Sequence, residues 1–126
     1  MKRVWFGVGL LVLLLAVSLG VTWGMVKIHE PIAADLRQAA QCGSLGDWHN
    51  AEFFSRRAEV AWNHWARFRG CFADHTPTEE IGAELAAMDI ARQGRETADF
   101  AAACARAAKM VQAVGDAHAL YWWNLL

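Results

Sequence analysis

The sequence has little proline, a single tyrosine, and no stretch rich in serine, glycine or glutamine. Two of its 126 residues are proline, whereas seven are tryptophan. A chain of this composition can bury enough apolar surface to offset the entropy lost on folding, which argues against disorder. About 100 residues follow an N-terminal apolar run, enough for one modest core. We therefore expect one folded domain.

The sequence also lacks an excess of charge of either sign. Twelve basic residues stand against thirteen acidic ones, a formal net charge of -1. Two of the basic residues, Lys2 and Arg3, precede the apolar run, which leaves the rest of the chain slightly acidic. A chain with this balance has no excess of positive charge that could attract a polyanion, so we expect no nucleic-acid partner.

Catalytic motifs are missing as well. The sequence contains no glycine-rich phosphate loop, no glycine-bracketed serine, and neither H-x-x-x-H nor C-x-x-C. Helix caps and solvated helix faces account for its acidic residues. We therefore expect neither an enzyme nor a cofactor.

The clearest feature present is a charge-free run over residues 4–26. A helix of this length spans about 34 Å, slightly more than a bilayer core. Trp5 and Trp23 lie near its ends, where indole rings favour the headgroup layer. We predict that residues 1–28 form a signal-anchor transmembrane helix. The alternatives are a cleaved secretory signal, for which Ser18 to Gly20 offers a poor cleavage site, and a buried soluble helix.

The basic N-terminus favours one orientation of this helix. Lys2, Arg3 and the terminal amine lie on one side, and Lys27 and Arg37 on the other. The positive-inside rule then places the N-terminus in the cytosol. We expect a single-pass protein of the cell membrane with an extracytoplasmic domain. Gly20 and Gly24 have the spacing that lets two membrane helices approach, which allows a homodimer without requiring one.

The residue pattern predicts helices throughout residues 29–126. Glu30-Pro31 predicts a kink or a new helix start, followed by a helix over residues 31–42. Asp47 suits the N-cap of a second helix, and Thr76-Pro77 with Glu79 forms the start of a third. A fourth is expected over residues 96–114, with an interruption at Gly115. The inward faces follow from apolar positions three and four apart: Ile32, Leu36 and Ala39 or Ala40; Trp48, Ala51, Ser55, Ala58, Trp62 and Trp65; Ile81, Leu85 and Met88; Phe100, Cys104, Ala107, Val111 and Val114.

No strand pattern competes with these helices, so the predicted fold class is all-α. Short connections favour antiparallel neighbours. We therefore expect the transmembrane helix to be followed by a small antiparallel bundle of about four helices, arranged as two helical hairpins.

Several short motifs together resemble a bacterial family of unknown function. They are the basic N-terminus with its anchor, Gly46-Asp47-Trp48 with Ala51, Ala58 and Trp62, the segment Phe72-Ala73-Asp74-His75, and the terminal Asn124-Leu125-Leu126. The resemblance covers nearly the whole chain and implies a small, N-terminally membrane-anchored helical protein. It implies no activity, cofactor or catalytic residue.

Three histidines fall at junctions that a bundle would bring to its membrane-facing end. His29, His75 and His118 lie beside Glu30, Asp74 and Asp116. Such a cluster could bind zinc or respond to pH, although its members are far apart in sequence and loop histidines are usually solvated. The three cysteines are expected to be free thiols, since an antiparallel bundle separates Cys42 from Cys71 by about 30 Å, and an intermolecular bridge through Cys42 is the alternative.

The C-terminus is unusually apolar for a chain end. Its large side chains could cap the bundle core, rest in the bilayer interface or dock onto another membrane protein. These side chains are Tyr121, Trp122, Trp123, Leu125 and Leu126.

The sequence favours a membrane-tethered, non-enzymatic interaction or accessory module of a membrane assembly, with the lipid bilayer and another membrane protein as its partners. The alternative is a membrane-proximal sensor or metal-binding module that uses the histidine and carboxylate cluster.

Overall fold

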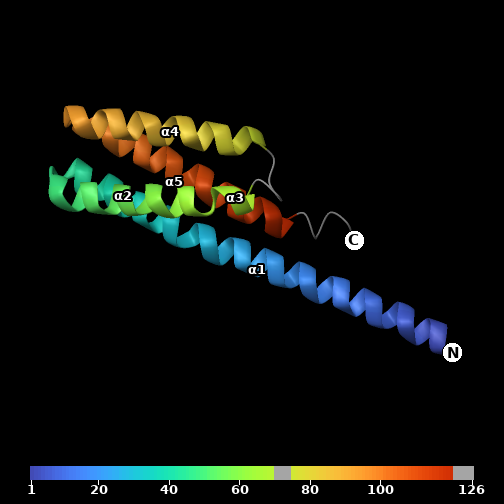
Figure 1. Ribbon diagram of the computed structural model, residues 1–126. Helices are drawn as coiled ribbons and strands as arrows, with labels where there is room; N and C mark the ends of the chain where they lie inside the picture. Colours follow the sequence, from blue (N-terminus) through green and yellow to red (C-terminus); the bar gives the residue numbers. More distant parts are fainter. Residues whose placement is uncertain (70–74, 121–126) are drawn as a thin grey trace.

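The computed structural model describes residues 1–69 and 75–120, with the side chains of residues 68–69, 75–76 and 118–120 left out. The described residues form helices and contain no strand, which confirms the expected all-α class (Figure 1). The helices are α1 (Lys2–Ser44), α2 (Trp48–His64), α3 (Ala66–Arg69), α4 (His75–Gly94) and α5 (Thr97–Leu120).

Helix α1 runs without a break from the N-terminus into the folded domain. Pro31 lies inside it, so the new helix start expected at this position is wrong. A proline removes one backbone hydrogen bond, here the one to the Lys27 carbonyl. The turns on both sides are nevertheless held by packing, because Met25 and His29 are buried before Pro31 and Ile32 after it. The helix thus passes through the boundary expected between residues 28 and 29.

The connection between α1 and α2 follows the expected turn chemistry. Gly46 adopts a positive φ of 76°, and Asp47 caps α2 by accepting a hydrogen bond from the Asn50 backbone N–H at 3.3 Å. The Asn50 side chain also donates to the Asp47 carboxylate, and these hydrogen bonds lower the pKa of Asp47. The chain therefore reverses over three residues.

Helices α1 and α5 occupy the centre of the domain. The C-terminal half of α1 packs against both α5 and α2, and α4 packs against α5 (Figure 1). The inward residues expected from the sequence are buried, from Ile32 and Leu36 in α1 to Val111 and Val114 in α5, except Trp48 and Trp65 at the two ends of α2, which are half-buried. The hydrophobic periodicity therefore identified the core face of each helix.

Helix α5 continues through Gly115, so the expected interruption is wrong. A Cβ at this position would lie 3.3 Å from the Cβ of His29. The missing side chain at Gly115 lets α5 approach α1 closely, a packing role that does not require the helix to end.

Candidate membrane and interaction surfaces

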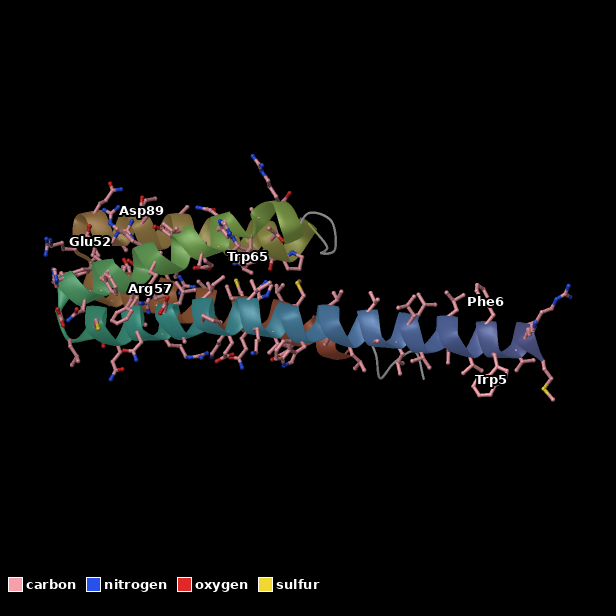
Figure 2. All side chains as sticks on the ribbon, turned by 60° about the horizontal axis from the view of Figure 1, so that its bottom comes forward. Trp5, Phe6, Glu52, Arg57, Trp65 and Asp89 are labelled. Atoms are coloured by element: carbon pink, nitrogen blue, oxygen red, sulfur yellow. The ribbon has the colours of Figure 1, made fainter. Side chains whose placement is uncertain are left out.

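The N-terminal half of α1 extends beyond the other helices as an apolar rod (Figure 1). Every large apolar side chain from Val4 to Trp23 is at least 38% exposed. Figure 2 shows Trp5 and Phe6 projecting from this part of the helix. Among the described residues, α1 is the one helix long and apolar enough to cross a membrane, and none of its most apolar stretch is buried. Soluble proteins rarely expose so large a continuous apolar surface.

The change from exposed to packed helix takes place between Trp23 and His29. Trp23 is 63% exposed, whereas Met25 is 1% exposed. The ammonium of Lys27 lies 3.8 Å from the ring centroid of Trp23, a cation–π contact. An indole next to a lysine is typical of the level where a membrane helix meets lipid headgroups.

The structure places His29 in the interior of the domain. Its imidazole packs edge-on against the ring of Trp62, with centroids 6.1 Å apart, and lies against Gly115 of α5. Its Nδ1 donates a hydrogen bond to the Met25 carbonyl at 2.7 Å. His29 therefore belongs to the contact of α1 with α2 and α5.

The other two histidines of the expected cluster lie in helices whose ends are described without side chains. His75 begins α4 and His118 lies in α5, but neither side chain is among those described. Within the described residues, no group of three histidine, cysteine or carboxylate side chains could hold a metal ion. The metal or sensor site stays a prediction. The C-terminal residues 121–126, with Tyr121, Trp122, Trp123, Leu125 and Leu126, lie outside the described residues.

A polar cluster around Arg92 joins α4 to α2. Arg92 is 8% exposed and donates to the Ser55 hydroxyl at 2.9 Å. It also forms ion pairs with Glu59, at 3.4 Å, and with Asp89. Burial raises the pKa of Glu59, and the nearby Arg92 opposes this rise. The cluster thus fills the space between two helices whose backbones make few close contacts.

Sequence reasoning missed this cluster, although a signal for it was present. Arg92 follows Leu85 and Met88 by seven and four residues, which places it on the buried stripe of α4. A cation on an apolar stripe requires a buried partner. Ser55 was correctly placed on the inward face of α2.

Two of the three cysteines are described, and both are free thiols. Cys104 is fully buried, and burial raises its pKa to about 12. A thiol of this kind is a small hydrophobe at neutral pH, without the thiolate that a nucleophile or metal ligand needs. Cys42 is half-buried, and Cys71 lies outside the described residues.

The outer face of α2 carries exposed apolar side chains. Phe53 is 54% and Val60 69% exposed. Arg57, labelled in Figure 2, lies 5.2 Å from the Phe53 ring and donates to the Asp35 carboxylate at 2.7 Å. The ion pair of Arg57 with Asp35 thus joins the outer face of α2 to α1.

A shallow open groove of about 300 Å³ follows the contact between α4 and α5. Alanines form its floor, and Ile90, which is 70% exposed, stands at its edge. Glu96 and Asp99 lie at one end, and the hydrogen bond between their carboxyl groups raises the pKa of Glu96. Apolar side chains and the charged side chains of Glu96, Asp99 and Arg106 thus share the lining of this groove.

No protein-family model, curated protein or solved structure matches this chain. The resemblance to a bacterial family of unknown function therefore stays an expectation.

Proposed function

We propose that this protein is a membrane-tethered, non-enzymatic interaction module, an accessory of a larger assembly in the cell membrane. A single transmembrane helix would hold an antiparallel bundle of two helical hairpins on the extracytoplasmic side. The observation that carries the proposal is the unbroken α1, whose first half is exposed and apolar and whose second half belongs to the domain core. One helix can serve as anchor and as structural element only if the domain sits directly on the membrane.

The exposed apolar side chains of the domain support a protein partner. Phe53 and Val60 on α2 and Ile90 on α4 are each more than half exposed. Side chains of this kind form the centre of contacts when a partner excludes water from them. Another membrane protein suits this surface, because a shared bilayer raises the effective concentration of both chains.

The anchor is tested by extracting membranes of producing cells with alkaline carbonate. The proposal expects the chain to stay in the membrane pellet, and the domain to be digested when protease is added outside intact cells. Release of the chain into the soluble fraction would rule out a transmembrane helix. Protection of the domain until the cells are opened would reverse the orientation and leave the anchor intact.

The partner is tested with a photo-crosslinking amino acid at Val60, and with the same amino acid at exposed Gln93 as the control. We expect one discrete crosslinked membrane protein from position 60. Equal, diffuse crosslinking from both positions would argue against a docking surface on α2.

A further inference from the structure

The surface that α4 and α5 form together is more apolar than a solvated helix face usually is. Figure 1 shows the two helices side by side, with α4 on the side of the domain away from α1. A helix face that meets only water normally carries charged and polar side chains. Around the groove between α4 and α5, in contrast, Ile90 is 70% exposed. Alanines occupy most of the other exposed positions there: Ala83, Ala86 and Ala87 in α4, and Ala98, Ala102 and Ala105 in α5.

The shape of this surface favours a helix as its occupant. The floor of the groove is made of Ala87 and Ala91 from α4 and of Ala102 and Ala103 from α5. Side chains this small let the axis of a third helix approach to about 8 Å. A peptide in extended conformation would instead need an exposed strand edge, and the described residues contain no strand.

One end of the groove carries negative charge that no cation neutralises. Glu96 and Asp99 line this end and are hydrogen-bonded to each other. The ion pairs formed among the described residues include neither of them. Arg95 is next to Glu96 in sequence, but its guanidinium lies over the ring of Trp48, 5.8 Å from the centroid. The two carboxyl groups are therefore available to a cation from outside the chain.

The remaining charges near the groove are already paired or lie farther away. Arg106 lines the groove two helical turns along α5 from the acidic end, and its Nε donates to both carboxylate oxygens of Glu84 at 3.1 Å. Lys109 lies about one turn farther still. Arg92 and Asp89 belong to the cluster between α4 and α2. The groove is thus acidic at one end and neutral at the other.

We propose that the groove between α4 and α5 binds a helix of another protein, which carries small apolar side chains and a lysine or arginine at the level of Glu96 and Asp99. The apolar side chains would cover the alanine floor and Ile90, and the cation would meet the two carboxyl groups. This inference deepens the proposed function, since that function requires a protein partner without naming its chemistry.

A second copy of the chain fits this groove less well than another protein does. Two copies anchored in one membrane would be related by a two-fold axis along the membrane normal. A contact through α4 and α5 would then bring Glu96 and Asp99 of both copies together at the same height. Like charges placed in this way oppose association, whereas a partner's cation is attracted by both carboxyl groups.

Full-length protein in neutral detergent micelles tests the inference with two designed helical peptides. Both have an alanine and leucine stripe and a photo-crosslinking residue at the centre, and they differ at one position near the end, which is lysine in one and glutamate in the other. Binding is measured as the saturable yield of crosslinked product, located by mass spectrometry. We expect the lysine peptide to crosslink within residues 87–106 and to bind at least threefold more tightly at low salt. High salt should reduce the difference because it screens the charges.

Charge variants test the acidic end. Glu96→Lys/Asp99→Lys should reverse the preference, so that the glutamate peptide binds more tightly. The milder Glu96→Gln/Asp99→Asn should abolish the preference, and it decides the question if the first variant does not fold. Glu79→Gln/Glu80→Gln removes two exposed carboxylates from the other end of α4 and should retain the native preference.

Steric variants test the groove itself. Ala102→Phe fills the groove and should weaken the binding of both peptides at least tenfold. Ala105 is exposed on the same helix but does not line the groove, so Ala105→Phe should bind as the native chain does. Unfolding temperatures establish that these variants are folded.

Several results would overturn the inference: no saturable binding of the lysine peptide, equal binding of the two peptides, a native preference in Glu96→Gln/Asp99→Asn, or native binding by Ala102→Phe. A dimer of the chain that Ala102→Phe separates would assign the groove to a second copy and would overturn the inference as well. Membrane extraction and crosslinking from Val60 do not depend on this groove, so these results leave the tests of the proposed function unchanged.

Discussion

At the scale of single residues, the contact between α1 and α5 depends on a missing side chain. Gly43 is buried, and a Cβ there would overlap the ring of Phe100, at 2.7 Å from Cε1. Phe100 is fully buried, and its ring packs against the ring of Trp48 with the centroids 5.3 Å apart. We expect Gly43→Ala to lower the free energy of unfolding by about 1–3 kcal/mol, as overpacking of a core does.

Gly82 is the matched control for this substitution. It lies inside α4 with no atom within 4 Å of a built Cβ. Gly82→Ala should raise stability by about 0.5–1 kcal/mol, because alanine has the higher helix propensity. Thermal unfolding of both variants in the same detergent provides the comparison. If Gly43→Ala is as stable as Gly82→Ala, the close approach of Phe100 is not a constraint.

Cys104 gives a second prediction at this scale. With a pKa of about 12, its thiol is almost entirely protonated at pH 7.5. In a variant with Cys42→Ser and Cys71→Ser, iodoacetamide should label Cys104 on the order of a thousandfold more slowly in the folded protein than in denaturant. Labelling at a similar rate in both states would mean that the core opens readily.

Residue types alone gave an incomplete account of the polar interior. The periodicity identified Cys104 and Ser55 as inward, and both are buried. His29 was expected at a junction, because Pro31 suggested that one helix ended and another began there. Once α1 is continuous, the spacing of His29 from Met25 and Ile32 places it on the core face. The misplacement of His29 thus follows from one misjudged helix boundary.

At the scale of helices, Pro31 is a local weakness in α1. It is exposed, and inside a helix it removes a backbone hydrogen bond and its ring crowds the carbonyl four residues earlier. We expect Pro31→Ala to stabilise the protein by about 1–3 kcal/mol. Pro77 lies in the first turn of α4, where proline costs little, so Pro77→Ala should change stability by less than about 0.5 kcal/mol.

The unfolding temperatures of the two proline variants measure these changes in stability. A destabilised Pro31→Ala variant would show that the proline ring itself contributes to the contact between the anchor and the domain.

Arg92 supplies the polar connection between α2 and α4. Replacing it with methionine keeps the apolar stem but leaves Glu59 partly buried without its cation. We expect Arg92→Met to cost about 2–4 kcal/mol at pH 7. Arg56 is exposed and pairs with Glu52 on the same helix, so Arg56→Met should cost less than about 0.5 kcal/mol.

The pH dependence of the Arg92 variant identifies the cause. The pKa of Glu59 is already raised by burial, and loss of Arg92 raises it further. A raised carboxyl pKa penalises the folded state only while the group is ionised, so the penalty disappears as pH falls below the ordinary value near 4.5. The destabilisation measured by urea unfolding should therefore be smaller at pH 4 than at pH 7. An unchanged difference would attribute it to lost packing.

Helix faces were predictable from sequence, whereas the continuation of α1 through Pro31 and of α5 through Gly115 was not. Spacing of apolar residues depends only on helix geometry, so Ile81, Leu85 and Met88 were assigned correctly. Proline and glycine are only local signals for a helix end. Packing across α1 and α5 outweighs both at Pro31 and Gly115, and this tertiary contribution cannot be read from local sequence.

At the scale of the whole molecule, α1 is divided into an exposed apolar half and a packed half. Its residues 4–23 make no contribution to the core, whereas residues 25–43 provide a large part of it. Because the helix is unbroken, a rotation or tilt of its N-terminal half is carried directly into the domain. The sequence predicted both halves, but it placed a separation between them that the structure does not have.

This division makes the two halves of α1 separable by mutation. Leu13 and Leu14 are 59% and 61% exposed and touch nothing in the core. Leu13→Arg/Leu14→Arg should disfavour membrane insertion by about 6 kcal/mol, at about 3 kcal/mol for each leucine replaced near the bilayer centre. We expect the variant to leave the carbonate-resistant pellet while the domain unfolds at an unchanged temperature.

Leu36→Arg is the opposite control, because Leu36 is fully buried in the domain. It should abolish cooperative unfolding and leave membrane insertion intact. If the double arginine variant unfolds the domain instead, the N-terminal half of α1 is a buried helix of a soluble assembly, and the tethered module proposed above is wrong.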